Sequence, residues 1–182
     1  MYKRQPKEGE FDIGSELFPK LVEEHVPFYA VDMKFQWLDV GNIKDIWSVT
    51  RDILDGKVPG YRVPGTQVRA GIWLGINTVI DLDNCNIEPP VVIGSGCKIE
   101  QGVSFKGPVL IGANCQLDTG SKIEESLIFD NIHVHQSETV REQTIFGNYC
   151  IGHDGRANEE ISWSNLRSQC TQKRVTDMIN GM

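Results

Sequence analysis

The chain has 182 residues, of which 40% are hydrophobic and 24% charged, a composition that is ordinary for a globular protein with one domain or two small ones. Its formal net charge of -7 gives no broad electrostatic reason to bind nucleic acid, and no apolar run is long enough to span a membrane. The N-terminal stretch has no apolar core and is not expected to be a signal peptide, and five cysteines without a Cys-x-x-Cys pair predict reduced thiols in the cytoplasm.

The beginning of the chain carries helix and strand signals in turn. Residues 14–25, GSELFPKLVEEH, are typical of a helix with Ser15 as its N-cap. Residues 26–41, VPFYAVDMKFQWLDVG, are rich in aromatic and β-branched side chains and therefore favour strands.

A second helix is predicted for residues 42–56, NIKDIWSVTRDILDG. Asn42 is its expected N-cap, Asp45 completes a spacing like that of a capping box, and Gly56 is expected to end the helix. Two Pro-Gly pairs in residues 57–67 then indicate a linker.

From about residue 74 to residue 152, apolar side chains return every six residues. The leading register is occupied by Ile87, Ile93, Ile99, Phe105, Ile111, Leu117 and Ile123, and a small or β-branched residue follows four positions after each of the first six. A helix would repeat at three and four and a flat strand at two, so neither explains this spacing. A repeat of six is typical of a parallel β-solenoid, in which three short strands close one coil of about 18 residues.

A coil of 18 residues requires residues 18 apart in the sequence to stack on one another. The expected pairs are Ile93 with Ile111, Val91 with Val109, Cys97 with Cys115 and Val103 with Ser121. The step shortens to five residues between Ile123 and Ile128, and it continues as far as Ile151. We expect Cys97 and Cys115 to be free thiols in a close-packed core, and we expect both open ends of the solenoid to be capped.

These signals divide the chain into three predicted parts: residues 1–60, 61–155 and 156–182. The first is a short α/β segment, the second is the solenoid of roughly four coils, and the third carries apolar residues at mixed helical spacing. The predicted fold class is therefore mainly β, with a helical cap of one or two helices at the C-terminal end.

Four stretches together resemble the sugar-phosphate nucleotidyltransferases. They are FDIGSELFPKLVEE (residues 11–24), FQWLDVGNIKDIW (35–47), FKGPVLIG (105–112) and ESLIFDNIHV (125–134). The likeness is greatest to the mannose-1-phosphate guanylyltransferase type, with glucose-1-phosphate thymidylyl- and adenylyltransferases as relatives. The resemblance implies that the solenoid is a left-handed parallel β-helix and that residues 1–60 are the end of a nucleotidyltransferase domain.

The same resemblance implies a reaction and a metal ligand. A sugar 1-phosphate attacks the α-phosphate of a nucleoside triphosphate and releases pyrophosphate, with Mg²⁺ offsetting the charge. In the family pattern W-x-D-x-G, the aspartate holds the metal, and in this chain it is Asp39. The glycine-rich loop of the family, close to AGGxGTRLxP, is not found here, so the chain by itself is expected to be inactive and to need the missing N-terminal half to bind both substrates.

Other interpretations of the repeat remain open at this stage. A hexapeptide-repeat acyltransferase would use a histidine as general base, and His133, His135 and His153 are the candidates. The same three histidines could hold zinc. The solenoid could also be a non-catalytic module for assembly, and a homo-oligomer formed through the β-helix or through residues 1–60 is the expected partner, with no nucleic acid and no membrane.

Overall fold

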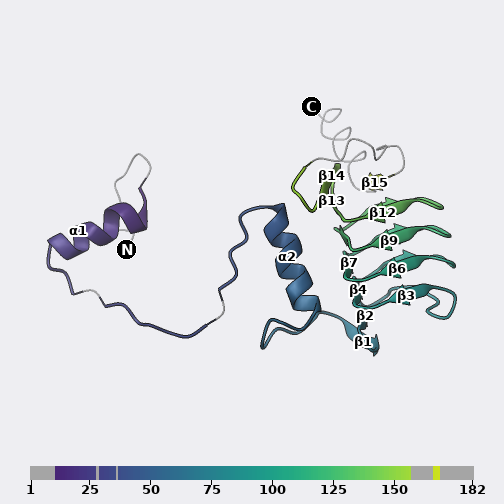
Figure 1. Ribbon diagram of the computed structural model, residues 1–182, viewed down its shortest axis with the longest axis horizontal. Helices are drawn as coiled ribbons and strands as arrows, with labels where there is room; N and C mark the ends of the chain where they lie inside the picture. Colours follow the sequence, from purple (N-terminus) through teal and green to yellow (C-terminus); the bar gives the residue numbers. More distant parts are fainter. Residues whose placement is uncertain (1–10, 28, 36, 157–165, 169–182) are drawn as a thin grey trace, which may run out of the picture. The chain divides into compact units, whose positions relative to one another are not determined.

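The computed structural model describes residues 11–27, 29–35, 37–156 and 166–168 (Figure 1). The chain forms two compact units, Met1–Trp37 and Leu38–Met182. Within the described ranges, no helix combines the length and the apolar character that crossing a membrane would need.

The described residues of the first unit include a π-helical turn η2 (Ile13–Leu17) that continues into α1 (Phe18–Glu23). The cap is Asp12, whose carboxylate Oδ1 accepts hydrogen bonds from the Ser15 amide at 2.6 Å and from the Ser15 hydroxyl at 2.8 Å. The predicted helix is confirmed, but the prediction that Ser15 is its N-cap is wrong. The Asp12 carboxylate accepts from the Ser15 amide itself, so Ser15 lies inside the helix, which begins at Ile13.

The predicted strands between residues 26 and 41 are not formed by the residues that the structure describes. This segment is extended, and its described residues pair with no strand. An extended segment becomes a strand only when another strand satisfies its amides and carbonyls. The side chains of Tyr29, Val31, Met33, Phe35 and Trp37 are exposed.

Helix α2 (Ile43–Leu54) begins and ends where the sequence predicts. Asn42 Oδ1 accepts a hydrogen bond from the Asp45 amide at 3.1 Å, and Asp45 Oδ2 accepts one from the Gly41 amide at 3.0 Å. The helix is followed by Gly56 at a φ of 72°, a left-handed conformation that glycine adopts without steric cost.

Residues 66–152 form three sheets, and from β3 to β13 every third strand belongs to the same sheet. The first wall contains β1 (Thr66–Arg69), β2 (Ile72–Leu74), β4 (Val91–Ile93), β7 (Val109–Ile111), β10 (Leu127–Ile128), β13 (Gln143–Phe146) and β14 (Tyr149–Gly152). The second wall contains β5 (Lys98–Ile99), β8 (Gln116–Leu117), β11 (Ile132–Val134) and β15 (Leu166–Ser168). The third wall contains β3 (Asn86–Glu88), β6 (Ser104–Lys106), β9 (Lys122–Glu124) and β12 (Thr139–Arg141).

The stacking that the repeat predicts is present. In the first wall β4 and β7 are parallel, with Val91 beside Val109 and Ile93 beside Ile111. After the shortened step the coil has one residue fewer, because Ile111 pairs with Ile128, 17 positions later. Glu125, at a φ of 43°, lies at the corner where this residue is lost. The β-solenoid of about four coils is confirmed, and its left-handedness stays a prediction.

Antiparallel strands lie at the ends of the parallel stack. Strand β1 pairs antiparallel with β2, and β14 folds back antiparallel on β13. This hairpin reverses the expected register, so that Cys150 lies beside Ile145 and is only 1% exposed, whereas Ile151 lies beside Thr144. The prediction that Ile151 continues the inward register is therefore wrong, because a hairpin does not keep the phase of a parallel coil.

The C-terminal cap is only partly within the described residues. At residues 166–168 it is strand β15, which pairs antiparallel with β11, so the expected helix is wrong at these three positions. The rest of the predicted cap, residues 157–165 and 169–182, lies outside the described residues.

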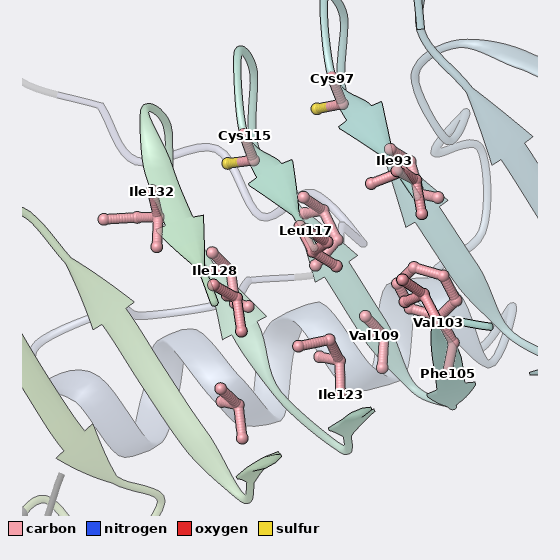
Figure 2. Packing of buried hydrophobic residues seen from close by; sticks show 14 of the residues in the cluster. Ile93, Cys97, Val103, Phe105, Val109, Cys115, Leu117, Ile123, Ile128 and Ile132 are labelled. Carbon is pink, nitrogen blue, oxygen red and sulfur yellow. The ribbon is translucent and has the colours of Figure 1, made fainter. Parts of the chain in front are cut away.

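The core is a continuous column of apolar side chains inside the three walls (Figure 2). Phe105, Leu117 and Ile123 fill it at different heights, and Cys97 and Cys115 lie on successive coils with their sulfurs pointing the same way. Both cysteines are free thiols, as predicted. Since each coil buries its inner face only against its neighbours, stability comes from the stack rather than from any single coil.

The outer face of the first wall is also buried. Val92, Leu127 and Thr144 point away from the core, yet each is buried, and α2 lies along this wall (Figure 1). On α2 the indole ring of Trp47 stacks on the imidazole of His153, which follows β14. The helix is thus part of the same compact unit as the solenoid.

The outer face of the third wall carries charges that alternate in sign along the stack. Glu88 lies beside Lys106, Lys106 beside Glu124, and Glu124 beside Arg141. The Arg141 Nε lies 2.7 Å from Glu124 Oε2. Opposite charges on adjacent strands favour this pairing.

Candidate functional site

The predicted metal ligand Asp39 lies in the extended segment before α2, where it is exposed. It does not cap the helix, because Asn42 does so. Its carboxylate has no hydrogen-bond or ion-pair partner among the residues that the structure describes.

A single carboxylate such as that of Asp39 is compatible with a metal site in which most other ligands come from the substrates or from water. Mg²⁺ takes oxygen ligands and is usually held by one or two carboxylates together with substrate phosphates. Asp39 fits one such position, and within the described part of the chain no group of three metal-ligating side chains includes it.

The structure separates the three histidines that the sequence offers as general bases or zinc ligands. His133 and His135 flank the buried Val134 on β11 and point outward, as predicted. His153 instead packs against α2, with its ring 3.7 Å from the ring of Trp47 and inclined by 18°. A site formed by all three imidazoles is therefore absent from the described residues.

Two of these histidines meet a residue that the sequence reasoning missed. His133 Nε2 lies 2.8 Å from Asp118 Oδ2, and His135 Nδ1 lies 3.6 Å from the same oxygen. We call Asp118, His133 and His135 the second-wall cluster. The signal that could have found Asp118 is the shortened coil, because Asp118 and His135 are 17 residues apart and thus adjacent in the stack.

The Asp118 carboxylate is held in its charged form. Partial burial by itself raises the pKa of Asp118, but hydrogen bonds from Gln116 and His133 outweigh this and leave the pKa below its ordinary value. Charges on the two imidazoles act in the same direction.

Comparison with known proteins identifies relatives of both the N-terminal segment and the solenoid. A family described as Nucleotidyl transferase matches residues 2–56. The UTP--glucose-1-phosphate uridylyltransferase of Synechocystis sp. is 39% identical over 152 residues, which cover 84% of this chain and 39% of the relative. The glucose-1-phosphate adenylyltransferase of Clostridioides difficile is 27% identical over 137 residues, which cover 71% of this chain and 33% of the relative.

The chain therefore spans less than two fifths of the length of these relatives. Within that span the likeness extends far beyond residues 2–56, so it includes the solenoid as well as the segment that contains Asp39 and α2. The chain, which itself forms a β-solenoid, is therefore a relative of sugar-phosphate nucleotidyltransferases.

Proposed function

We propose that the chain is part of an enzyme that makes a nucleoside-diphosphate sugar. In this reaction a phosphate oxygen of the sugar 1-phosphate attacks the α-phosphorus of a nucleoside triphosphate, and the bond to the departing pyrophosphate breaks. The observation that carries the proposal is the 39% identity over 152 residues with an enzyme named for this chemistry.

Asp39 is the residue of this chain that we assign to the reaction, as one carboxylate ligand of Mg²⁺. When bound, Mg²⁺ would offset the negative charge of the phosphates. The exposed position of Asp39, its lack of a partner in the described residues and its place just before a capped helix support this role.

The names of the relatives favour glucose 1-phosphate as the sugar substrate, with UTP or an adenylyl donor as the nucleotide. The sequence motifs favour mannose 1-phosphate with GTP as a narrower alternative. The three substrate pairs are therefore assayed side by side.

The test uses a chimera, because the chain covers only part of its relatives. This chain replaces the matching segment of the Synechocystis enzyme, and pyrophosphate release is measured with each substrate pair. We expect turnover that requires Mg²⁺, and none from the chain by itself. A chimera that is folded by circular dichroism but inactive with every pair would contradict the proposal.

We also propose that the solenoid supports self-association. Its regular parallel walls offer repeated flat surfaces of the kind that symmetric oligomers pack together. Light scattering on the purified chain tests this, and a monomer at all protein concentrations would contradict it.

A further inference from the structure

We propose that the second-wall cluster, Asp118, His133 and His135, binds a divalent transition-metal ion of the zinc class. This site is independent of the proposed nucleotidyltransferase activity and of the Mg²⁺ ligand Asp39. It is the group of three metal-ligating side chains that the described residues bring together, with ligand atoms within 4.8 Å of one another.

The solenoid itself creates the cluster. Val134 points into the core, so its neighbours His133 and His135 both point outward on the same side of β11. Strand β8 lies parallel to β11, with Gln116 beside His133, and the Asp118 amide donates to the Val134 carbonyl at 3.0 Å. The backbone ladder therefore fixes all three side chains on adjacent coils.

The distances suit a metal better than they suit a hydrogen-bonded cluster. His133 Nε2 at 2.8 Å can share a hydrogen with Asp118 Oδ2, but His135 Nδ1 at 3.6 Å is too far to do so. Ligand atoms bound tetrahedrally to zinc at about 2.0–2.1 Å lie about 3.3 Å apart. The two observed separations from Asp118 Oδ2 lie on either side of this value, and all three ligand atoms lie within 4.8 Å of one another.

The carboxylate is already oriented for this role. Gln116 Nε2 donates to Asp118 Oδ1 at 2.8 Å, which leaves Oδ2 facing both imidazoles. A partner that fixes a metal-binding carboxylate in this way is the usual outer support of a metal site.

Among the described residues, the three side chains of the cluster stay partly exposed. The side chains of Asp118 and His133 are each 20% exposed and that of His135 is 35% exposed, so a fourth ligand position can face solvent. One coil earlier, Glu100 accepts hydrogen bonds from the Thr119 amide and hydroxyl, and its other oxygen lies 3.4 Å from Lys98 Nζ. This carboxylate of the same wall is therefore already engaged.

The direct test is calorimetric titration of the full chain, after treatment with a chelator, with Zn²⁺ alone. We expect one ion per chain, and we expect Co²⁺ to give the visible absorption of a tetrahedral site. Asp118→Asn, His133→Gln and His135→Gln should each weaken binding by more than about 100-fold, and Gln116→Ala by about tenfold. Binding should also weaken in acid, because imidazoles bind metals only when neutral.

Two control variants make the test specific. Glu100→Gln removes a carboxylate from the same wall, and His25→Gln removes an imidazole from the first unit. Neither control should change the affinity by more than about twofold, given that neither residue belongs to the cluster. Absence of saturable binding, or equal affinity in folded cluster variants and controls, would overturn the proposal.

Discussion

The ring of Trp47 on α2 stacks on the ring of His153 at a centroid distance of 3.7 Å. Trp47 is 7% exposed, and it joins the helix to the end of the solenoid beyond β14. A helix that lies within the segment matched by the nucleotidyltransferase family is thus anchored on the repeat.

Replacing this indole should destabilise the second unit. We expect Trp47→Ala to lower the free energy of unfolding by about 3–5 kcal/mol, because a buried tryptophan leaves a cavity. Urea denaturation followed by circular dichroism measures this. Trp37→Ala is the matched control, since Trp37 is 75% exposed and its loss should change stability by less than about 0.5 kcal/mol. Equal effects of the two variants would refute the anchoring role.

The same contact should make stability depend on pH. Burial lowers the pKa of His153, with Glu142 and Gln143 opposing the shift and Arg51 adding to it. As pH falls below about 6.5, His153 becomes protonated in the unfolded chain, whereas in the folded chain it stays neutral until a lower pH. Stability is therefore complete above this pH and falls as the pH drops toward the lower pKa of the folded state.

The measurement is the free energy of unfolding at pH 7.5 and at pH 5.5, with a chelator present. We expect His153→Phe, which keeps a ring against Trp47 but cannot titrate, to lose less stability in acid than the unmodified chain. Parallel pH profiles for the two proteins would rule out His153 as the source. His25→Gln should follow the unmodified profile.

Two buried serines should respond in opposite ways to the same substitution. Ser121 and Ser126 are both fully buried, but the Ser121 hydroxyl has no hydrogen-bond partner within the part of the chain that the structure describes. Ser126 Oγ donates to the Glu124 carbonyl at 2.6 Å and accepts from the Gln143 amide at 3.1 Å. Ser126→Ala should cost about 1–3 kcal/mol, because it leaves buried groups unpaired, whereas Ser121→Ala should be neutral or stabilising. Thermal denaturation of both variants measures this difference, and an equal loss of stability in the two variants would contradict the prediction.

Removing the charge of Asp39 should affect catalysis and not folding. In the active chimera, Asp39→Asn should lower kcat by at least about 100-fold, comparable to the loss of other electrostatic groups that act on a transition state. The melting temperature should stay the same, because the side chain is exposed. Asp32→Asn is the control in the same extended segment and should leave kcat unchanged. An unaltered rate for Asp39→Asn would reject its role as a metal ligand.

The six-residue repeat predicts the solenoid well because it encodes a local geometry. Each large aliphatic residue has to point inward, so the stacking of Ile93 on Ile111 follows from spacing alone. The cap of α2 is predicted for the same reason, since Asn42 and Asp45 interact within one turn. Where a structural feature depends on a partner that is distant in the sequence, the spacing of residues does not predict it.

Three shortcomings of the prediction have that common cause. Residues 26–41 have strand-forming side chains, but no neighbouring strand is among the described residues. Cys150 takes the inward position expected for Ile151 because the chain reverses at the end of the stack. The second-wall cluster depends on one lost residue at a corner, which places Asp118 beside His135. A search at a period of 18 therefore misses it.

The alternating charges of the third wall help to determine which coil pairs with which, a choice that the apolar core does not determine. The same inward position of successive strands in this wall is apolar in each case: Ile87, Phe105 and Ile123. A chain that looped out one whole coil could therefore still place an apolar side chain in the core. Loss of the coil that carries Lys106 would set Glu88 beside Glu124, and loss of the coil that carries Glu124 would set Lys106 beside Arg141. In both cases like charges on adjacent strands repel. The charges therefore favour the correct order of the coils. Each coil has opposite charge to the coil that follows it in sequence, and the same charge as the coil after that.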